Sequence, residues 1–287
     1  MKTFIGSQYS RSAFPYEELY IYLLQGRVEE DDEDLFEDAF IGNWVEDDYS
    51  FLFFSKPAGD EIRRLLHVRS DLTLGDQYRF TYEEWQGGRF DAIKVDSFLI
   101  TPPWISQAQE KGMIQILLDP GVVFGNGLHP TTRDCLKAIA HAMKVDRFDR
   151  VLDMGTGTGI LALAAANMGA KRVSAVDLNP LCVKTAKHNV ILNGLDGIVD
   201  VTQGRAEDFM NEPADLVVAN IHHQVLVDLF ENGSFKDKSR LILSGLMRSQ
   251  AADIRSRLER HYFKLIHEWD HEMKWYTMLA CNEGIRC

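Results

Sequence analysis

The sequence predicts an α/β protein in which a smaller α+β domain precedes a doubly wound, mostly parallel sheet. Short apolar strands alternate with helix-forming stretches through the second part of the chain, as successive βαβ units require. A glycine-rich turn follows the first of these strands, and an acidic residue ends the second. Strands buried on both faces explain why the apolar runs are continuous and not alternating.

Four apolar segments predict the strands of this sheet. They lie at residues 150–153, 173–177, 216–220 and 241–244. Between the first two, residues 160–168 are rich in alanine, which is the best helix former. Between the next two, Asn179-Pro180 starts a helix and Asn193-Gly194 ends it.

The first part of the chain predicts a small α+β domain. Its expected elements are strands at 17–24, 49–54 and 98–100 and a helix at 60–68. A Pro-Pro pair at 102–103 disfavours helix, and the polar segment 105–112 that follows has no periodicity. We therefore expect a small domain over 1–100, a linker over 101–115 and a ligand-binding domain over 116–287.

Composition limits the kinds of partner. A net charge of −12 would repel a phosphate backbone, so strong nucleic-acid binding is not expected, whereas a basic protein substrate would be attracted. The acidic run 29–34 is either a solvated loop or a surface that steers such a partner. No run approaches the roughly 18 apolar residues of a membrane span, and residues 1–7 lack the apolar core of a secretory signal. We expect a cytoplasmic protein, not a membrane protein.

The glycine turn at 153–159 is the most informative segment. Its glycines let a ligand approach the backbone without a Cβ in the way. The pattern is G-x-G-x-G and not the dinucleotide fingerprint G-x-G-x-x-G, which favours a methionine-bearing nucleoside over a pyrophosphate. We therefore predict S-adenosyl-L-methionine as the cofactor. The expected binding residues in the turn are Asp153, Gly155, Thr156, Gly157 and Gly159. The four cysteines show no metal-ligand spacing, so no metal site is expected.

Two polar residues end predicted strands at the same edge of the sheet. Asp177 follows the turn by about 20 residues, where an acid accepts hydrogen bonds from both ribose hydroxyls, although a plain helix cap is the alternative. Asn220 ends the third strand. We hypothesise that Asn220, Ile221 and His222 position an amine that receives the methyl group. His222 or His223 is alternatively a base or a structural histidine.

The loop 119–132 precedes the glycine turn and holds several glycines and prolines around Phe124. It is either a mobile, lid-like segment over the site or an ordinary turn-rich loop.

Together these segments resemble the bacterial methyltransferases of ribosomal protein L-eleven. The family patterns D-P-G-x-x-F-G-x-G-x-H-P-T-T, D-x-G-x-G-x-G and A-N-I are matched at 119–132, 153–159 and 219–221. The resemblance implies a Rossmann-like class I methyltransferase domain behind a small ferredoxin-like substrate-recognition domain. It also implies methylation of lysine or N-terminal amines on that ribosomal protein, with S-adenosyl-L-methionine as the methyl donor.

The resemblance also assigns residues. By position it gives cofactor binding to Thr132, Gly155, Asp177 and Asn220. It places Phe124, Gly125 and His129 near the methionine end of the cofactor or the substrate entrance, and we count the first two among the cofactor-binding residues.

Three alternatives stay open. A class I methyltransferase acting on another protein or a small molecule is one, because residues 222–224 depart from the family pattern. A non-catalytic module that only binds S-adenosylmethionine is the second. An NAD-dependent dehydrogenase is the third, since doubly wound sheets carry many chemistries.

Overall fold

The structure is a computed structural model that describes residues 15–89, 91–106 and 109–285. Residues 1–7, on which the absence of a secretory signal was judged, lie outside this range. The chain divides into two compact units. The first comprises Met1–Asp91 and Pro103–Ser106, and the second comprises Ala92–Pro102 and Gln107–Cys287.

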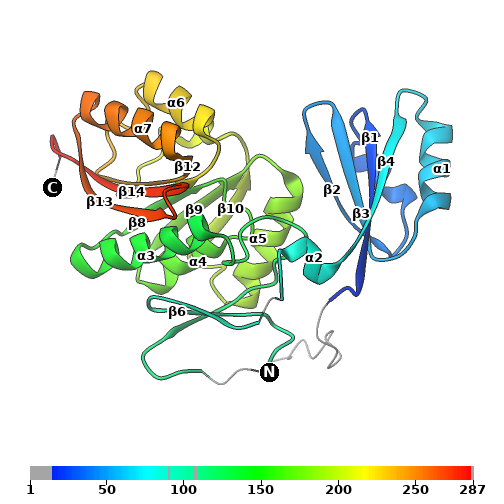
Figure 1. Ribbon diagram of the computed structural model, residues 1–287, viewed down its shortest axis with the longest axis horizontal. Helices are drawn as coiled ribbons and strands as arrows, with labels where there is room; N and C mark the ends of the chain where they lie inside the picture. The colour runs from blue at the N-terminus through cyan, green and yellow to red at the C-terminus, as the bar shows by residue number, and fades with distance from the viewer. Residues whose placement is uncertain (1–14, 90, 107–108, 286–287) are drawn as a thin grey trace. The chain divides into compact units, whose positions relative to one another are not determined.

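The first unit is a four-stranded antiparallel sheet with the strand order β2-β3-β1-β4 (Figure 1). Its strands are β1 Glu18–Gln25, β2 Phe40–Glu46, β3 Tyr49–Phe54 and β4 Thr73–Thr81. Its helices are the 3-10 helix η1 Glu30–Leu35, α1 Gly59–Val68 and α2 Tyr82–Gln86. This is the ferredoxin-like order of strands, with the first crossover helix reduced to η1.

One face of this sheet packs on α1. Alternate residues of the strands point to the same face, so Tyr22, Leu24, Leu52 and Phe54 form a core together. Ile62 and Leu65 lie three residues apart on α1 and cover that core. The predicted helix at 60–68 is therefore confirmed, and its apolar spacing is explained.

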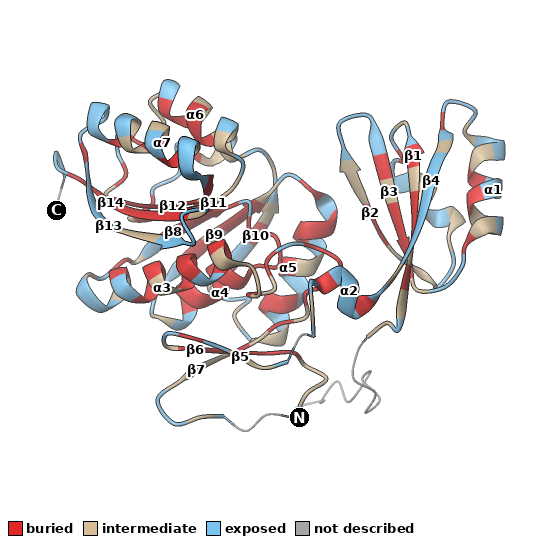
Figure 2. Cartoon of the chain, viewed as in Figure 1, coloured by how far each residue is buried: buried red, intermediate tan, exposed pale blue. Residues whose placement is uncertain are grey.

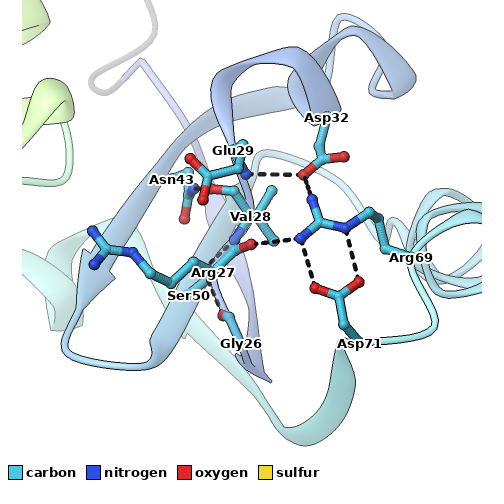
Figure 3. Close-up of polar contacts among 9 residues, drawn as sticks. All are labelled: Gly26, Arg27, Val28, Glu29, Asp32, Asn43, Ser50, Arg69 and Asp71. Atoms are coloured by element: carbon cyan, nitrogen blue, oxygen red, sulfur yellow. Dashed lines mark hydrogen bonds and ion pairs between the residues drawn. The ribbon is translucent and has the colours of Figure 1, made fainter.

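Part of the acidic run stabilises this unit (Figure 3). Asp32 forms an ion pair with Arg69 and accepts a 2.9 Å hydrogen bond from the backbone N–H of Glu29. Arg69 also pairs with Asp71 and donates to the carbonyl of Arg27 at 3.2 Å. The carboxylate of Asp32 thus links η1 to the segment that follows α1. Four other residues of the run are exposed: Glu29, Glu30, Asp31 and Asp34.

The second unit is built on a seven-stranded sheet with the order β10-β9-β8-β11-β12-β14-β13. The five neighbouring strands β10, β9, β8, β11 and β12 are parallel, and β14 is antiparallel to both of its neighbours. The strands are β8 Arg150–Met154, β9 Arg172–Asp177, β10 Val199–Gln203, β11 Leu216–Asn220, β12 Arg240–Met247, β13 Phe263–His271 and β14 Trp275–Asn282. The predicted doubly wound, mostly parallel sheet is confirmed.

Helices cover both faces of this sheet, with α6 and α7 on one face and α3, α4 and α5 on the other (Figure 1). They are α3 Pro130–Val145, α4 Ile160–Asn167, α5 Pro180–Leu192, α6 His223–Glu231 and α7 Arg248–Arg260, with a 3-10 helix η2 at Ala206–Phe209. The central strands are buried along most of their length (Figure 2). Within the described ranges, no helix combines the length and apolar character needed to cross a membrane.

A small three-stranded sheet shows where the two units divide. It has the order β5-β6-β7, with β5 Ile93–Val95, β6 Phe98–Thr101 and β7 Ile114–Leu117. The sequence predicts a strand at 98–100 in the first domain and a linker at 101–115. In the structure β6 belongs to the second unit, because it pairs with β7 at the far end of that segment.

Candidate functional site

The glycine turn links β8 to α4 at the carboxyl end of the sheet. The N–H groups of Gly155 and Thr156 both donate to the carbonyl of Val176, at 2.8 and 3.0 Å. Gly155 has φ +67°, and a Cβ there would lie 2.3 Å from Cγ2 of Ile221. At Gly157 a Cβ would lie 2.5 Å from the carbonyl oxygen of Phe124. These glycines are required by the close packing of the site itself.

Asp153 lies beneath this turn and is completely buried. Its Oδ2 accepts hydrogen bonds from Oγ1 of Thr156 at 2.6 Å and from the N–H of Ala162 at 3.1 Å. Its Oδ1 is buried without a hydrogen-bond partner among the described residues. Burial raises the pKa of Asp153 to about 7. The hydroxyl of Thr156 therefore faces inward and donates its hydrogen bond to the carboxyl group of Asp153.

Asp177 ends β9 beside the turn and is half-buried. Its Oδ2 accepts from the N–H of Gly157 at 2.9 Å, and its Oδ1 accepts from the N–H of Asn179 at 3.0 Å. Burial raises its pKa. Helix α5 is capped by Asn179, whose Oδ1 accepts from the N–H of Leu181 at 2.9 Å. Asp177 is thus not the cap of α5, and its carboxylate is held against the glycine turn.

The loop 119–132 is anchored by Asn189, a buried residue of α5 that the sequence analysis did not single out. Its Nδ2 donates to the carbonyls of Asp119 and Thr158, at 2.8 and 2.9 Å, and its Oδ1 accepts from the N–H of Asp119 at 2.8 Å. Thr158 in turn donates its hydroxyl to the carbonyl of Gly125 at 2.8 Å. The loop is therefore fixed to the turn at these points, while the side chain of Phe124 is 51% exposed.

Asn220 ends β11 at the same edge. Its Nδ2 donates to Oγ1 of Thr131 at 3.3 Å. A Cβ on Gly245 would lie 3.2 Å from Oδ1 of Asn220 and 2.9 Å from the carbonyl oxygen of Ile221. Both acceptor oxygens therefore lie close to Gly245, which has no side chain.

The structure distinguishes Thr131 from Thr132. Thr132 is the predicted site residue, and its Oγ1 is buried without a partner in the described part of the chain. Thr131, which it did not select, is the residue that contacts Asn220. Helical periodicity separates neighbouring side chains by about 100°, and the sequence alone does not say which of two adjacent threonines faces β11.

The two histidines after Ile221 have different surroundings. His222 is exposed and directly precedes α6. His223 points to α7, where its Nε2 lies 2.9 Å from Oδ2 of Asp253. Arg257 donates to the same carboxylate at 2.9 Å. His223 is therefore a bridge between two helices.

An aromatic cluster lies at the end of the loop. The ring of His129 meets the rings of Phe124 and Trp275 edge-on, with centroids 5.3 and 5.1 Å away.

Among the described residues, no group of three acidic, histidine or cysteine side chains is arranged to hold a metal ion.

The sheet order and the site define a class. The order of the parallel strands reverses between β8 and β11, and the glycine turn, Asp177 and Asn220 all lie at the carboxyl edge around that switch point. Doubly wound sheets bind their ligands there. With an antiparallel β14 between β12 and β13, the second unit is a Rossmann-like domain of the class I methyltransferase type.

The comparisons with known proteins identify the family. The family model described as ribosomal protein L11 methyltransferase (PrmA) matches residues 81–283. Ribosomal protein L11 methyltransferases from Anoxybacillus flavithermus and Geobacillus kaustophilus are each 36% identical over 69% of the chain. A crystal structure of the ribosomal protein L11 methylase from Lactobacillus delbrueckii subsp. bulgaricus is 32% identical, with a TM-score of 0.58, and covers 67% of this chain and 99% of its own. The chain belongs to the ribosomal protein L11 methyltransferase family.

The similarity is concentrated in the second unit. The family match starts at residue 81, near the end of the first unit. The chain spans 65% of the length of each of the two curated relatives named above.

Proposed function

We propose that this chain is an S-adenosyl-L-methionine-dependent N-methyltransferase that acts on lysine or N-terminal amines of ribosomal protein L11. Family membership and the names of the relatives support the reaction and the substrate. The observation that carries the proposal is the pair of acceptor oxygens on Asn220 and Ile221, next to the glycine turn. An amine nucleophile needs acceptors of this kind.

The residues at the carboxyl edge fit the cofactor. The carboxylate of Asp177 accepts from the N–H groups of Gly157 and Asn179 and from the thiol of Cys182, and it lies at the edge of the sheet where a ribose hydroxyl would bind. At this edge of the sheet, Oδ1 of Asp153 and Oγ1 of Thr132 are buried without a hydrogen-bond partner among the described residues. Leaving such atoms unpaired costs about 1–3 kcal/mol each, which a polar ligand in this site would offset. When bound, S-adenosyl-L-methionine supplies an activated methyl group on a sulfonium.

The acceptor pair orients the amine. A neutral amine donates its N–H groups to Oδ1 of Asn220 and the carbonyl of Ile221, which leaves its lone pair free to attack. Holding reactants in this way saves roughly 7–11 kcal/mol of barrier. Deprotonating a lysine at pH 7 costs about 4.6 kcal/mol, against about 1 kcal/mol for an α-amine. An N-terminal amine is therefore the easier target.

The charge of the chain fits a basic protein partner. With a net charge of −12, the protein attracts a cationic substrate and speeds its encounter. We assign substrate recognition to the ferredoxin-like first unit, and we place the reaction in the cytoplasm because ribosomal proteins are made there.

The test uses the whole chain, methyl-labelled S-adenosyl-L-methionine and purified ribosomal protein L11, with mass spectrometry of the intact substrate. We expect mass increments of one or more methyl groups. At saturating cofactor, the Asn220→Ala variant is expected to transfer at least about tenfold more slowly, because one acceptor of the amine is removed.

Other outcomes would redirect the proposal. Label on a different component of a cell extract, and none on L11, would keep the reaction and discard the substrate. Cofactor binding without any transfer would make the chain a binding module. If S-adenosyl-L-methionine does not bind at all, the proposal is wrong as a whole.

A further inference from the structure

We infer that His129 is a positioning residue for the methyl transfer proposed above: through Thr131 it fixes the orientation of the Asn220 amide. His129 and Asn220 lie on different elements, at the start of α3 and the end of β11. The inference rests on the proposed function and adds to it a residue for which the resemblance gives only an approximate place.

A continuous chain of hydrogen bonds joins the two residues. Nδ1 of His129 lies 2.8 Å from Oγ1 of Thr131 and also accepts from the N–H of Thr131 at 3.4 Å. A backbone N–H can only donate, so Nδ1 is an acceptor and the ring proton is on Nε2. The Thr131 hydroxyl then donates to His129, and its lone pairs are left to accept from Nδ2 of Asn220 at 3.3 Å.

The direction of this chain determines which end of the amide faces the amine. Because Nδ2 of Asn220 is engaged by Thr131, Oδ1 is the atom that lies next to Gly245 and the carbonyl of Ile221. A rotated amide would present N–H groups in that place. Those groups would donate to the amine lone pair and block its attack.

The surroundings of His129 keep its ring neutral. The ring is half-buried between Phe124 and Trp275, and Thr131 beneath it is 1% exposed. The side chains of His271 and Lys274 face the ring. Burial first, and then these two groups, lower the pKa of His129.

Protonation of His129 would break this chain of hydrogen bonds. A proton on Nδ1 turns the acceptor into a donor, so neither the hydroxyl nor the N–H of Thr131 can bond to it. The Thr131 hydroxyl is then free to rotate and no longer selects one orientation of Asn220. These hydrogen bonds therefore add an acid-sensitive step to a reaction that already needs a neutral amine.

The decisive variants are His129→Asn and His129→Ala, with His67→Asn as the control at an exposed site of the first unit. An asparagine oxygen occupies the position of Nδ1 and still caps α3, but it does not titrate. We expect His129→Asn to keep kcat within about threefold, and His129→Ala to lower kcat at least about tenfold with unchanged cofactor affinity. Thr131→Val should lower kcat as much as His129→Ala does. The double variant should be no slower than either single variant, because both substitutions break the same chain of hydrogen bonds.

The pH profile separates positioning from folding. At saturating cofactor, log kcat/KM of the unaltered protein should rise with pH with a slope of 1 from the amine, steepening to 2 below the pKa of His129. In His129→Asn the slope should stay at 1. An unchanged profile in His129→Asn, or an unchanged kcat in His129→Ala, would overturn the inference.

A second measurement needs no activity. Nitrogen NMR of the whole chain labelled with ¹⁵N-histidine reports which ring nitrogen carries the proton. We expect an unprotonated Nδ1 in His129 at neutral pH, with His67 as the exposed reference. A protonated Nδ1 in the neutral ring would refute the inference whether or not methyl transfer is observed, whereas absent transfer with the expected tautomer would count only against the proposed function.

Discussion

The two ends of the seven-stranded sheet differ in a way that locates the site. The amino end has a hollow of about 580 Å³ lined by polar residues from the starts of β8 and β11 and the segments before β11 and β12, among them Arg150, Asn211, Asp215 and Lys238. Several polar groups there are paired within the protein. Asp215 accepts from the N–H groups of Asp149 and Arg150 at 3.1 and 2.8 Å, and Lys238 donates to the carbonyl of Glu212.

The carboxyl end has tight glycine packing, two carboxyl groups with raised pKa and buried polar atoms without partners in the described chain. The comparison teaches that a hollow by itself does not identify a site. Strand direction does, because doubly wound sheets bind their ligands at the carboxyl ends of their parallel strands. Four substitutions test this contrast.

The largest effect is expected for Gly155→Ala. The added Cβ would lie 2.3 Å from Cγ2 of Ile221, and φ is +67°. We expect S-adenosyl-L-methionine binding to fall below detection in calorimetry. Gly169→Ala is the control, since φ is +109° there but no atom lies within 4 Å of the new Cβ, so only backbone strain of about 1 kcal/mol is added. Equal losses in the two variants would show that backbone strain, and not close packing, governs the turn.

The next effect is a pH dependence of stability from Asp153. Its pKa is raised from 3.8 to about 7, so the unfolded chain releases this proton at a lower pH than the folded one. The folded protein therefore loses stability as pH rises from about 4 to about 7, by at most about 1.4 kcal/mol per pH unit, and the loss levels off above that range. Asp153→Asn mimics the neutral form and should not show this loss.

Urea unfolding of both proteins at pH 5, 6, 7 and 8 measures this effect as a difference, so that groups common to both cancel. A difference that is constant across these pH values would mean that Asp153 titrates normally.

A smaller effect is expected for Asp177→Asn. The amide keeps one acceptor for a backbone N–H but loses the charge and one of the acceptor positions that we assign to the ribose. Hydrogen bonds to charged groups are worth about 1.5–3 kcal/mol, so the Kd for S-adenosyl-L-methionine should rise about tenfold to hundredfold. Asp208→Asn, at an exposed position, is the matched control. An unchanged Kd would remove Asp177 from the cofactor site.

The smallest effect is expected at the amino end. Asn211 is exposed and lines the hollow there. Asn211→Ala should change stability by less than about 0.5 kcal/mol and leave cofactor affinity unchanged. A clear loss of affinity in this variant would contradict the assignment of the ligand to the carboxyl end.

Local patterns predicted the parts of the site that lie within a short stretch of chain. The turn at 153–159 and Asp177 follow directly from strand ends and glycine spacing, and the structure brings them together through the bond from Gly157 to Asp177. Strands β8, β9, β11 and β12 were likewise predictable, because buried parallel strands are continuous apolar runs, whereas β10, β13 and β14 were not predicted.

Contacts between distant segments were not predictable in this way. Thr131 reaches Asn220 across 89 residues, and Asn189 reaches Asp119 across 70. No local period encodes such pairs. The pairing of β6 with β7 belongs to the same class, which explains why the domain division was expected nearer residue 100 than Asp91.

The antiparallel strand β14 also has a consequence for how the chain is made. It follows β13 in sequence but lies between β12 and β13 in the sheet. On a translating ribosome, β13 emerges with no neighbour to pair with, and β12 keeps an open edge until β14 arrives. Strand β13 therefore joins the sheet only through β14, the last strand synthesised in the described chain, so this half of the sheet is not assembled strand by strand in the order of translation.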